Sequence, residues 1–222
     1  MNIDDLIKHY PRLYHMAEAG TWDSIERHGL MSTTALLDLF EINGAQRRTI
    51  EDERRPECVE ITHKKHGKAI IRDQKPMTES ALLKCLEHPY KPCYWYRILN
   101  SNVFFWLDSR RLDGLLGARA YRNKHHYVLT LDSKALITAN AKSILLSPMN
   151  SGSTIYRPLP RGAKTFQPIG DFPFDERRAT RAIQNTVVEL LVKYAVPNVR
   201  DFVLKVDERK GPNVVKTVWQ RK

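Results

Sequence analysis

Three separated segments of this 222-residue chain carry side chains that could do chemistry together. His15 lies in the short apolar stretch 13–16, aromatic residues fill 103–107, and Glu189 interrupts the apolar run 187–192. An apolar strand has little reason to carry a lone carboxylate unless that carboxylate has a partner or a task. If three strands bring these segments together, they form a pocket able to hold a dinucleotide and stabilise a cation.

The elements that position these residues follow from local patterns. Thr21 is the expected cap of a helix that ends at Gly29. A hairpin is expected from two strands, 59–62 and 69–72, joined by a turn at 64–67. Glu189 belongs either to a strand or to the solvated face of a helix over 182–194, and the apolar run favours the strand. Helices are expected at 3–9, 22–28, 32–40 and 79–86, and further strands at 14–16, 103–107, 127–131, 144–146 and 202–206.

These elements predict an α+β fold with a partly antiparallel sheet, because no strict βαβα rhythm is visible. Neither G-x-G-x-x-G after a strand nor G-x-x-x-x-G-K-[ST] occurs, which argues against Rossmann and P-loop folds. The length suits a single domain spanning 1–222, with 41–100 as a candidate insert. We expect residues 45–57 to form an exposed, charged connection or helix end, 156–174 to be irregular, and the basic tail 208–222 to fray.

Composition limits the class of protein and suggests a partner. Thirty-six Lys and Arg against twenty-five Asp and Glu give a net charge of +11, which favours a polyanionic partner, nucleic acid first. The plainer reading is a soluble basic protein. No apolar run is long enough to cross a membrane, no signal peptide is visible, and three cysteines suit reduced thiols, so we expect a cytoplasmic protein without a membrane partner.

The order of the motifs resembles a known fold. Residues 13–16, a helix, and then 28–32 with its Gly-Leu turn resemble the opening of ADP-ribosyltransferase folds, including DarT-like toxins and RNA 2′-phosphotransferases. Residues 189–197 look like the late strand that carries the catalytic Glu in DarT-like enzymes. Residues 71–77, 103–106 and 146–152 are similar to an uncharacterised bacterial family associated with that fold. The resemblance implies a split, mostly antiparallel sheet with helical insertions.

The same resemblance implies an NAD-dependent ADP-ribosyltransferase that modifies a macromolecule, most readily nucleic acid and otherwise protein. It further implies a toxin or phage-defence role, with an antitoxin as an additional partner. Glu189 would stabilise the oxocarbenium-like transition state and act as base, and Arg72, ahead of Arg157 and Arg161, would orient NAD. The expected cofactor contacts are His15, Met16, Ser32, Thr33, Phe105 and Trp106, and the expected acceptor contacts are Asn150, Ser151, Arg157 and Arg161.

Each of these residues also has a plain structural interpretation, and three other functions stay open. His15 and the 104–106 aromatics suit a core, and Arg72 suits a solvated surface. A zinc-stabilised nucleic-acid-binding module would use cysteines and histidines whose spacing matches no common zinc pattern. The other two are an RNA 2′-phosphotransferase and a transferase fold that only binds a partner. The zinc alternative rests on Cys58, His63, His66, Cys85, His88 and Cys93.

Overall fold

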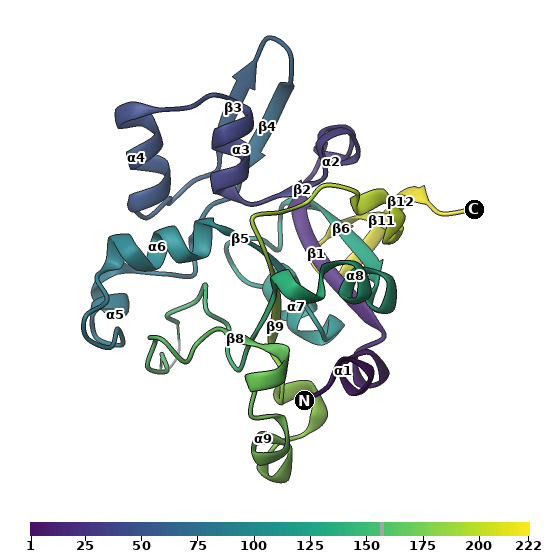
Figure 1. The fold of residues 1–222 in the computed structure, drawn as a ribbon. Coiled ribbons are helices and arrows are strands. Elements are labelled where there is room, and N and C mark those ends of the chain that lie inside the picture. Colours follow the sequence, from purple (N-terminus) through teal and green to yellow (C-terminus); the bar gives the residue numbers. More distant parts are fainter. Residues whose placement is uncertain (156–157) are drawn as a thin grey trace.

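The computed structural model describes residues 1–155 and 158–222, and it has the α+β architecture that the sequence predicts (Figure 1). An eight-stranded sheet has the order β12–β11–β6–β1–β5–β9–β7–β8, with every neighbouring pair antiparallel. Its strands are β1 (Arg12–Glu18), β5 (Asn102–Trp106), β6 (His125–Asp132), β7 (Ile144–Ser147), β8 (Gln167–Pro168), β9 (Glu189–Lys193), β11 (Val203–Lys210) and β12 (Asn213–Gln220). Two small sheets pair β2 (Leu30–Met31) with β10 (Ala195–Val196) and β3 (Val59–His63) with β4 (Gly67–Ile71).

Alternation along the strands gives the large sheet two covered faces. On one face, Leu13, Phe105 and Leu190 contribute to the main core, which also buries the apolar sides of the helices α1 and α8. On the other face, Met16 packs against α7, and Phe104 against α5 and α6. The helices are α1 (Ile3–His9), α2 (Trp22–His28), α3 (Thr33–Leu39), α4 (Gly44–Asp52), α5 (Glu79–Leu83), α6 (Pro92–Asn100), α7 (Ser109–Leu116), α8 (Ser133–Asn140) and α9 (Phe174–Thr180).

The sheet is split between its two central strands. β1 pairs with β6 along its whole length, from Arg12 to Glu18, but with β5 only where Tyr14 faces Trp106. β5 in turn pairs throughout with β9. Beyond this single contact β1 and β5 diverge, so backbone groups that would bond in a continuous ladder become available for other partners.

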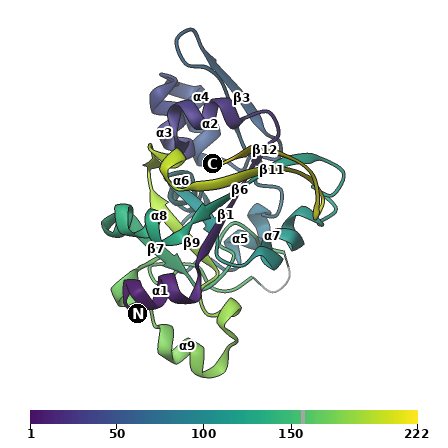
Figure 2. The ribbon, with the colours of Figure 1, turned by 90° about the vertical axis from the view of Figure 1, so that its right-hand side faces the viewer.

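A smaller layer lies at the end of the sheet toward which the split opens. The hairpin β3–β4 and the helices α3 and α4 share a separate apolar cluster, and both views place them together, at the opposite end of the molecule from α1 and α9 (Figures 1 and 2). This layer begins before residue 41 and ends near residue 71, while α5 and α6 pack in another cluster. The insert predicted at 41–100 is therefore divided between two packing units.

Local patterns predicted many of the elements, but they did not indicate the helices α6, α7, α8 and α9, and three further expectations need correction. Residues 45–57, expected to be an exposed connection or helix end, hold nearly all of the helix α4, and Arg55 beyond it is buried. The tail does not fray, because residues 213–220 form β12 against β11. Thr21 precedes α2 as predicted, but its hydroxyl donates to the Glu18 carbonyl at 2.7 Å instead of capping the helix. Within residues 1–155 and 158–222, no helix is long and apolar enough to cross a membrane.

Candidate functional site

A cavity of about 320 Å³ opens where β1 and β5 diverge. The chain from α2 to the start of α3 forms one wall, and β4 with the residues after it forms another. All three segments singled out in the sequence reach it, through His15, the aromatic residues of β5 and Glu189. The cavity also contacts several polar residues that the sequence did not indicate, namely Glu18, Asp73, Asn100 and Tyr121.

His15 occupies the split itself. Its Nδ1 donates a 2.8 Å hydrogen bond to the carbonyl of Phe104, in a stretch where β1 and β5 are no longer paired. Burial lowers the pKa of His15 to about 4; the bond to Phe104 opposes this shift and the nearby charge of Arg72 adds to it. The ring is therefore neutral at physiological pH, and with the proton on Nδ1 its Nε2 is a hydrogen-bond acceptor.

Glu189 is the first residue of β9, in line with Trp106 on β5 and Ser147 on β7. Its side chain is only 4% exposed, and Oε2 accepts hydrogen bonds from the backbone N–H (3.1 Å) and hydroxyl (2.7 Å) of Ser151. Burial raises the pKa of Glu189 to about 7, against the opposing effect of these two bonds. No Lys, Arg or His in the described part of the chain forms a direct ion pair with it, although the charges of Arg161 and Arg111 lie close enough to lower its pKa. A buried carboxylate with hydrogen bonds but no direct ion pair favours positive charge beside it.

Arg72 lies directly after β4 and is anchored to the end of β1. Its Nε donates to Glu18 Oε1 at 3.1 Å, Nη1 donates to the Met16 carbonyl at 3.4 Å, and the guanidinium lies 5.3 Å from the ring centre of Tyr121. Nη2 makes no hydrogen bond within the residues described. The guanidinium is thus fixed at the cavity wall with one nitrogen available, instead of projecting from the surface.

The two aromatic residues of β5 singled out in the sequence lie on opposite faces of the sheet. Phe105 is 1% exposed and belongs to the main core, where its ring centre lies 5.7 Å from that of His15. Trp106 and Phe104 are half-buried on the other face and line the cavity. Met16 lines it too, although its side chain packs under α7. Trp106 and Phe104 therefore offer more accessible ring surface to a ligand than Phe105 does.

Ser32 and Thr33 both line the cavity at the start of α3, but their hydroxyls differ in availability. Ser32 is buried, and its Oγ accepts the backbone N–H of Ala35 at 3.1 Å as the helix cap. Thr33 is half-buried at the first helical position. Of the two predicted contacts, Thr33 has the side chain that can turn to a ligand.

The predicted acceptor loop holds the catalytic candidate in place. Ser151 is fully buried and donates two hydrogen bonds to Glu189, whereas Asn150 lines the cavity. Arg161 is 1% exposed and donates to backbone carbonyls of the same loop, including those of Leu159 (2.7 Å) and Ser153. The expectation that Arg161 faces a phosphate backbone is therefore wrong, because its guanidinium is buried and donates hydrogen bonds to backbone carbonyls of the loop. Arg157, the other predicted arginine, lies outside the described residues.

The cysteines and histidines of the zinc alternative do not gather. Cys85 is buried beside Arg161, whereas His63 and His66 stack at the tip of the β3–β4 hairpin with ring centres 4.8 Å apart. Among the described residues, the group of three ligand-type side chains within mutual reach is instead Glu18, Cys58 and Asp73. Only Cys58 is common to both sets.

Comparison with known proteins gives a family but no activity. A family model described as "Family of unknown function (DUF7002)" matches residues 11–203, which include the whole cavity wall. No curated protein matches the chain.

Proposed function

We propose that this chain, which belongs to the DUF7002 family, binds NAD in the cavity between β1 and β5 and transfers ADP-ribose to a macromolecule. The observation that supports this most is Glu189, a buried carboxylate that has no direct ion-pair partner among the described residues and lies at the wall of a ligand-sized cavity. A carboxylate held in this way is costly for the fold and is suited to stabilising a cation that forms beside it.

The residues of the cavity fit the parts of a dinucleotide. The half-buried rings of Trp106 and Phe104 suit a flat base, and the acceptor nitrogen of His15 suits a ribose hydroxyl. Arg72 has an unbonded nitrogen for a phosphate oxygen. The cavity volume of about 320 Å³ is near the lower end of the volumes found for small-molecule sites. It therefore suits one nucleoside half of NAD, with the other half of the dinucleotide extending out of the cavity.

When bound, NAD supplies an ADP-ribosyl group whose bond to nicotinamide breaks with positive charge developing on the ribose. The Glu189 carboxylate stabilises that charge, while the two bonds from Ser151 keep its orientation fixed. The same carboxylate accepts the proton of the attacking acceptor group. The neutral His15 adds no positive charge that would oppose the developing cation.

The acceptor that the charge favours is nucleic acid. A net charge of +11 attracts polyanions over a long range, and protein is the second candidate. A toxin or phage-defence role, with an antitoxin that restrains it, accords with modification of nucleic acid and belongs to the same proposal.

The test is transfer of label from NAD. Purified protein is incubated with NAD labelled in its ADP-ribose part and, separately, with single-stranded DNA, RNA or cell lysate, beside Glu189→Gln. We expect label on nucleic acid with the native protein only, together with release of nicotinamide. Transfer by Glu189→Gln at the native rate would refute the proposed site. Absence of both transfer and NAD binding by calorimetry would refute the proposed function and leave a non-catalytic module.

A further inference from the structure

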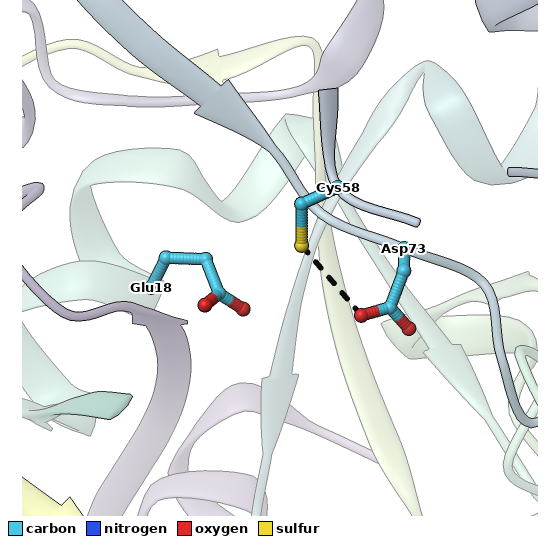
Figure 3. A group of neighbouring side chains, drawn as sticks. All are labelled: Glu18, Cys58 and Asp73. Atoms are coloured by element: carbon cyan, nitrogen blue, oxygen red, sulfur yellow. Dashed lines mark hydrogen bonds between the residues drawn. The ribbon is translucent and has the colours of Figure 1, made fainter. Parts of the chain in front are cut away.

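A second cluster of side chains lies at the edge of the same cavity, where β1 ends beside the β3–β4 hairpin (Figure 3). Glu18 is the last residue of β1, Cys58 directly precedes β3, and Asp73 follows β4 by two positions. One ligand atom from each lies within 4.8 Å of the others. In Figure 3 the Cys58 thiol points into the space between the two carboxylates, and it donates to Asp73 Oδ2 at 3.6 Å.

Donors outside the cluster hold the carboxylate of Asp73 by its far oxygen. Asp73 Oδ1 accepts the hydroxyl of Tyr121 at 2.5 Å and the backbone N–H of Lys75 at 3.1 Å. Oδ2 is left facing the thiol. Metal-binding carboxylates are commonly oriented by such outer hydrogen bonds, so the arrangement presents Asp73 Oδ2 as a ligand.

Glu18 is arranged in the same way from the opposite side. Its Oε1 accepts Arg72 Nε at 3.1 Å, whereas Oε2 makes no hydrogen bond within the part of the chain described. The cluster therefore offers a cation Asp73 Oδ2, Glu18 Oε2 and the Cys58 sulfur. The other oxygen of each carboxylate already accepts hydrogen bonds from outside the cluster. With Cys58 as thiolate the three ligands carry three negative charges, and the Arg72 cation beside Glu18 offsets one of them.

His126 supplies a second, independent observation beside this cluster. It faces Glu18 across the β1–β6 pair and is fully buried, with Nδ1 lying 3.5 Å from Glu18 Oε1. Nδ1 has only this long contact with Glu18, and Nε2 has no hydrogen-bond partner among the described residues. A buried imidazole with one nitrogen unsatisfied and the other weakly bonded is uncommon and costs free energy, whereas imidazole nitrogen is a frequent metal ligand.

We propose that Glu18, Cys58 and Asp73 bind one zinc-type divalent cation, with His126, which contacts Glu18, as the candidate nitrogen donor for the fourth position. Sulfur together with carboxylate oxygen and imidazole nitrogen is a ligand set that Zn²⁺ accepts. Binding forms a metal–sulfur bond and releases the thiol proton of Cys58 to solvent. The ion would join the end of β1 to both ends of the β3–β4 hairpin, which is a role separate from NAD cleavage.

Metal binding to the full chain tests this directly. After treatment with a chelator and removal of the chelator, the protein is titrated with Zn²⁺ in competition with a chromophoric chelator, and with Co²⁺ by absorption. We expect one ion per chain, a thiolate-to-cobalt charge-transfer band, and a rise in melting temperature on adding Zn²⁺. None of these readouts depends on NAD, so failure here and failure of the proposed transferase activity can be told apart.

Matched variants locate the ion. Cys58→Ser should abolish the charge-transfer band and, with Asp73→Asn, weaken Zn²⁺ binding by at least about 100-fold. Cys93→Ser, which alters a half-buried cysteine outside the cluster, should keep both signals. Circular dichroism of the metal-free proteins checks folding. No binding by the folded native protein, or unchanged binding by Cys58→Ser, as the half-buried hairpin histidines would produce, would overturn the proposal.

Discussion

At the scale of single residues, Glu189 sets the pH dependence of the proposed reaction. Burial raises the pKa of Glu189 to about 7, whereas that of His15 is lowered to about 4. Of these two residues, only Glu189 should therefore change charge between pH 5 and 8. We predict that kcat/KM rises tenfold per pH unit below about pH 7 and levels off above it. A rate profile that is flat across this range would contradict a role for the Glu189 anion.

The same pKa predicts that Glu189 costs stability. Because its folded pKa of about 7 exceeds the ordinary 4.5, the folded state holds the extra proton between these values, and stability falls as pH rises through this window. At pH 8 the cost is about 3 kcal/mol. Glu189→Gln, which removes the charge and keeps an acceptor for Ser151, should recover about that amount at pH 8 and little at pH 4.5.

Urea unfolding at the two pH values measures this difference. The exposed Glu53 provides the matched control, since Glu53→Gln should leave the free energy of unfolding nearly unchanged at both. A Glu189→Gln protein that is less stable than the native protein at pH 8 would mean that the carboxylate supports the fold. Gain of stability with loss of transfer would be the pattern of a residue retained for function.

At the scale of elements, the turn between α2 and β2 holds one wall of the cavity in place. Gly29 has a φ of +86°, and a Cβ added there would lie 2.5 Å from the Cα of Pro197, just after β10. Gly20 has nearly the same φ, +85°, with nothing within 4 Å of an added Cβ. Gly20→Ala should therefore cost only the backbone strain, about 1–2 kcal/mol.

Gly29→Ala should cost several kcal/mol more, because the β2–β10 pair must separate to make room. Thermal unfolding of both variants compares the crowded Gly29 with a glycine of similar φ that has open space around it. Equal losses of melting temperature would show that the chain near Pro197 gives way freely. That result would remove the reason for treating this wall of the cavity as rigid.

The elements show why the sequence predicts some features and conceals others. The strand around Glu189 was predictable, because an unbroken apolar run signals a buried strand and leaves the carboxylate conspicuous. α4 was concealed by its many charges, which resemble a solvated connection. Arg161 was misread for a related reason, since a loop arginine is ordinarily exposed and nothing local signals the carbonyls that bury it.

The cluster of Glu18, Cys58 and Asp73 could not have been predicted from spacing. Its members come from three segments that meet only when the β3–β4 hairpin folds back against the end of β1. Such contacts between distant segments leave no periodic pattern in the sequence. Cys58 alone was noticed, as a possible zinc ligand, but with partners that the fold places elsewhere.

At the scale of the whole molecule, the charge of +11 predicts binding to nucleic acid in advance of any reaction. The exposed Lys64 and Lys65 lie in the turn of the β3–β4 hairpin, whose other end lines the cavity. A strand held there would be positioned for transfer. We predict that single-stranded nucleic acid binds with a strong salt dependence; about four phosphate contacts would weaken binding about 50-fold for a fourfold rise in salt.

A pair of double variants separates local contacts from the effect of net charge. Lys64→Glu/Lys65→Glu should reduce both the affinity and its salt dependence, measured by fluorescence anisotropy of a labelled oligonucleotide. Lys134→Glu/Lys142→Glu makes the same change in net charge at exposed positions on α8 and directly after it. It should weaken binding much less, because long-range attraction falls off within about 10 Å at 0.1 M salt. Equal effects of both pairs would assign binding to the overall charge and leave the hairpin without a specific role.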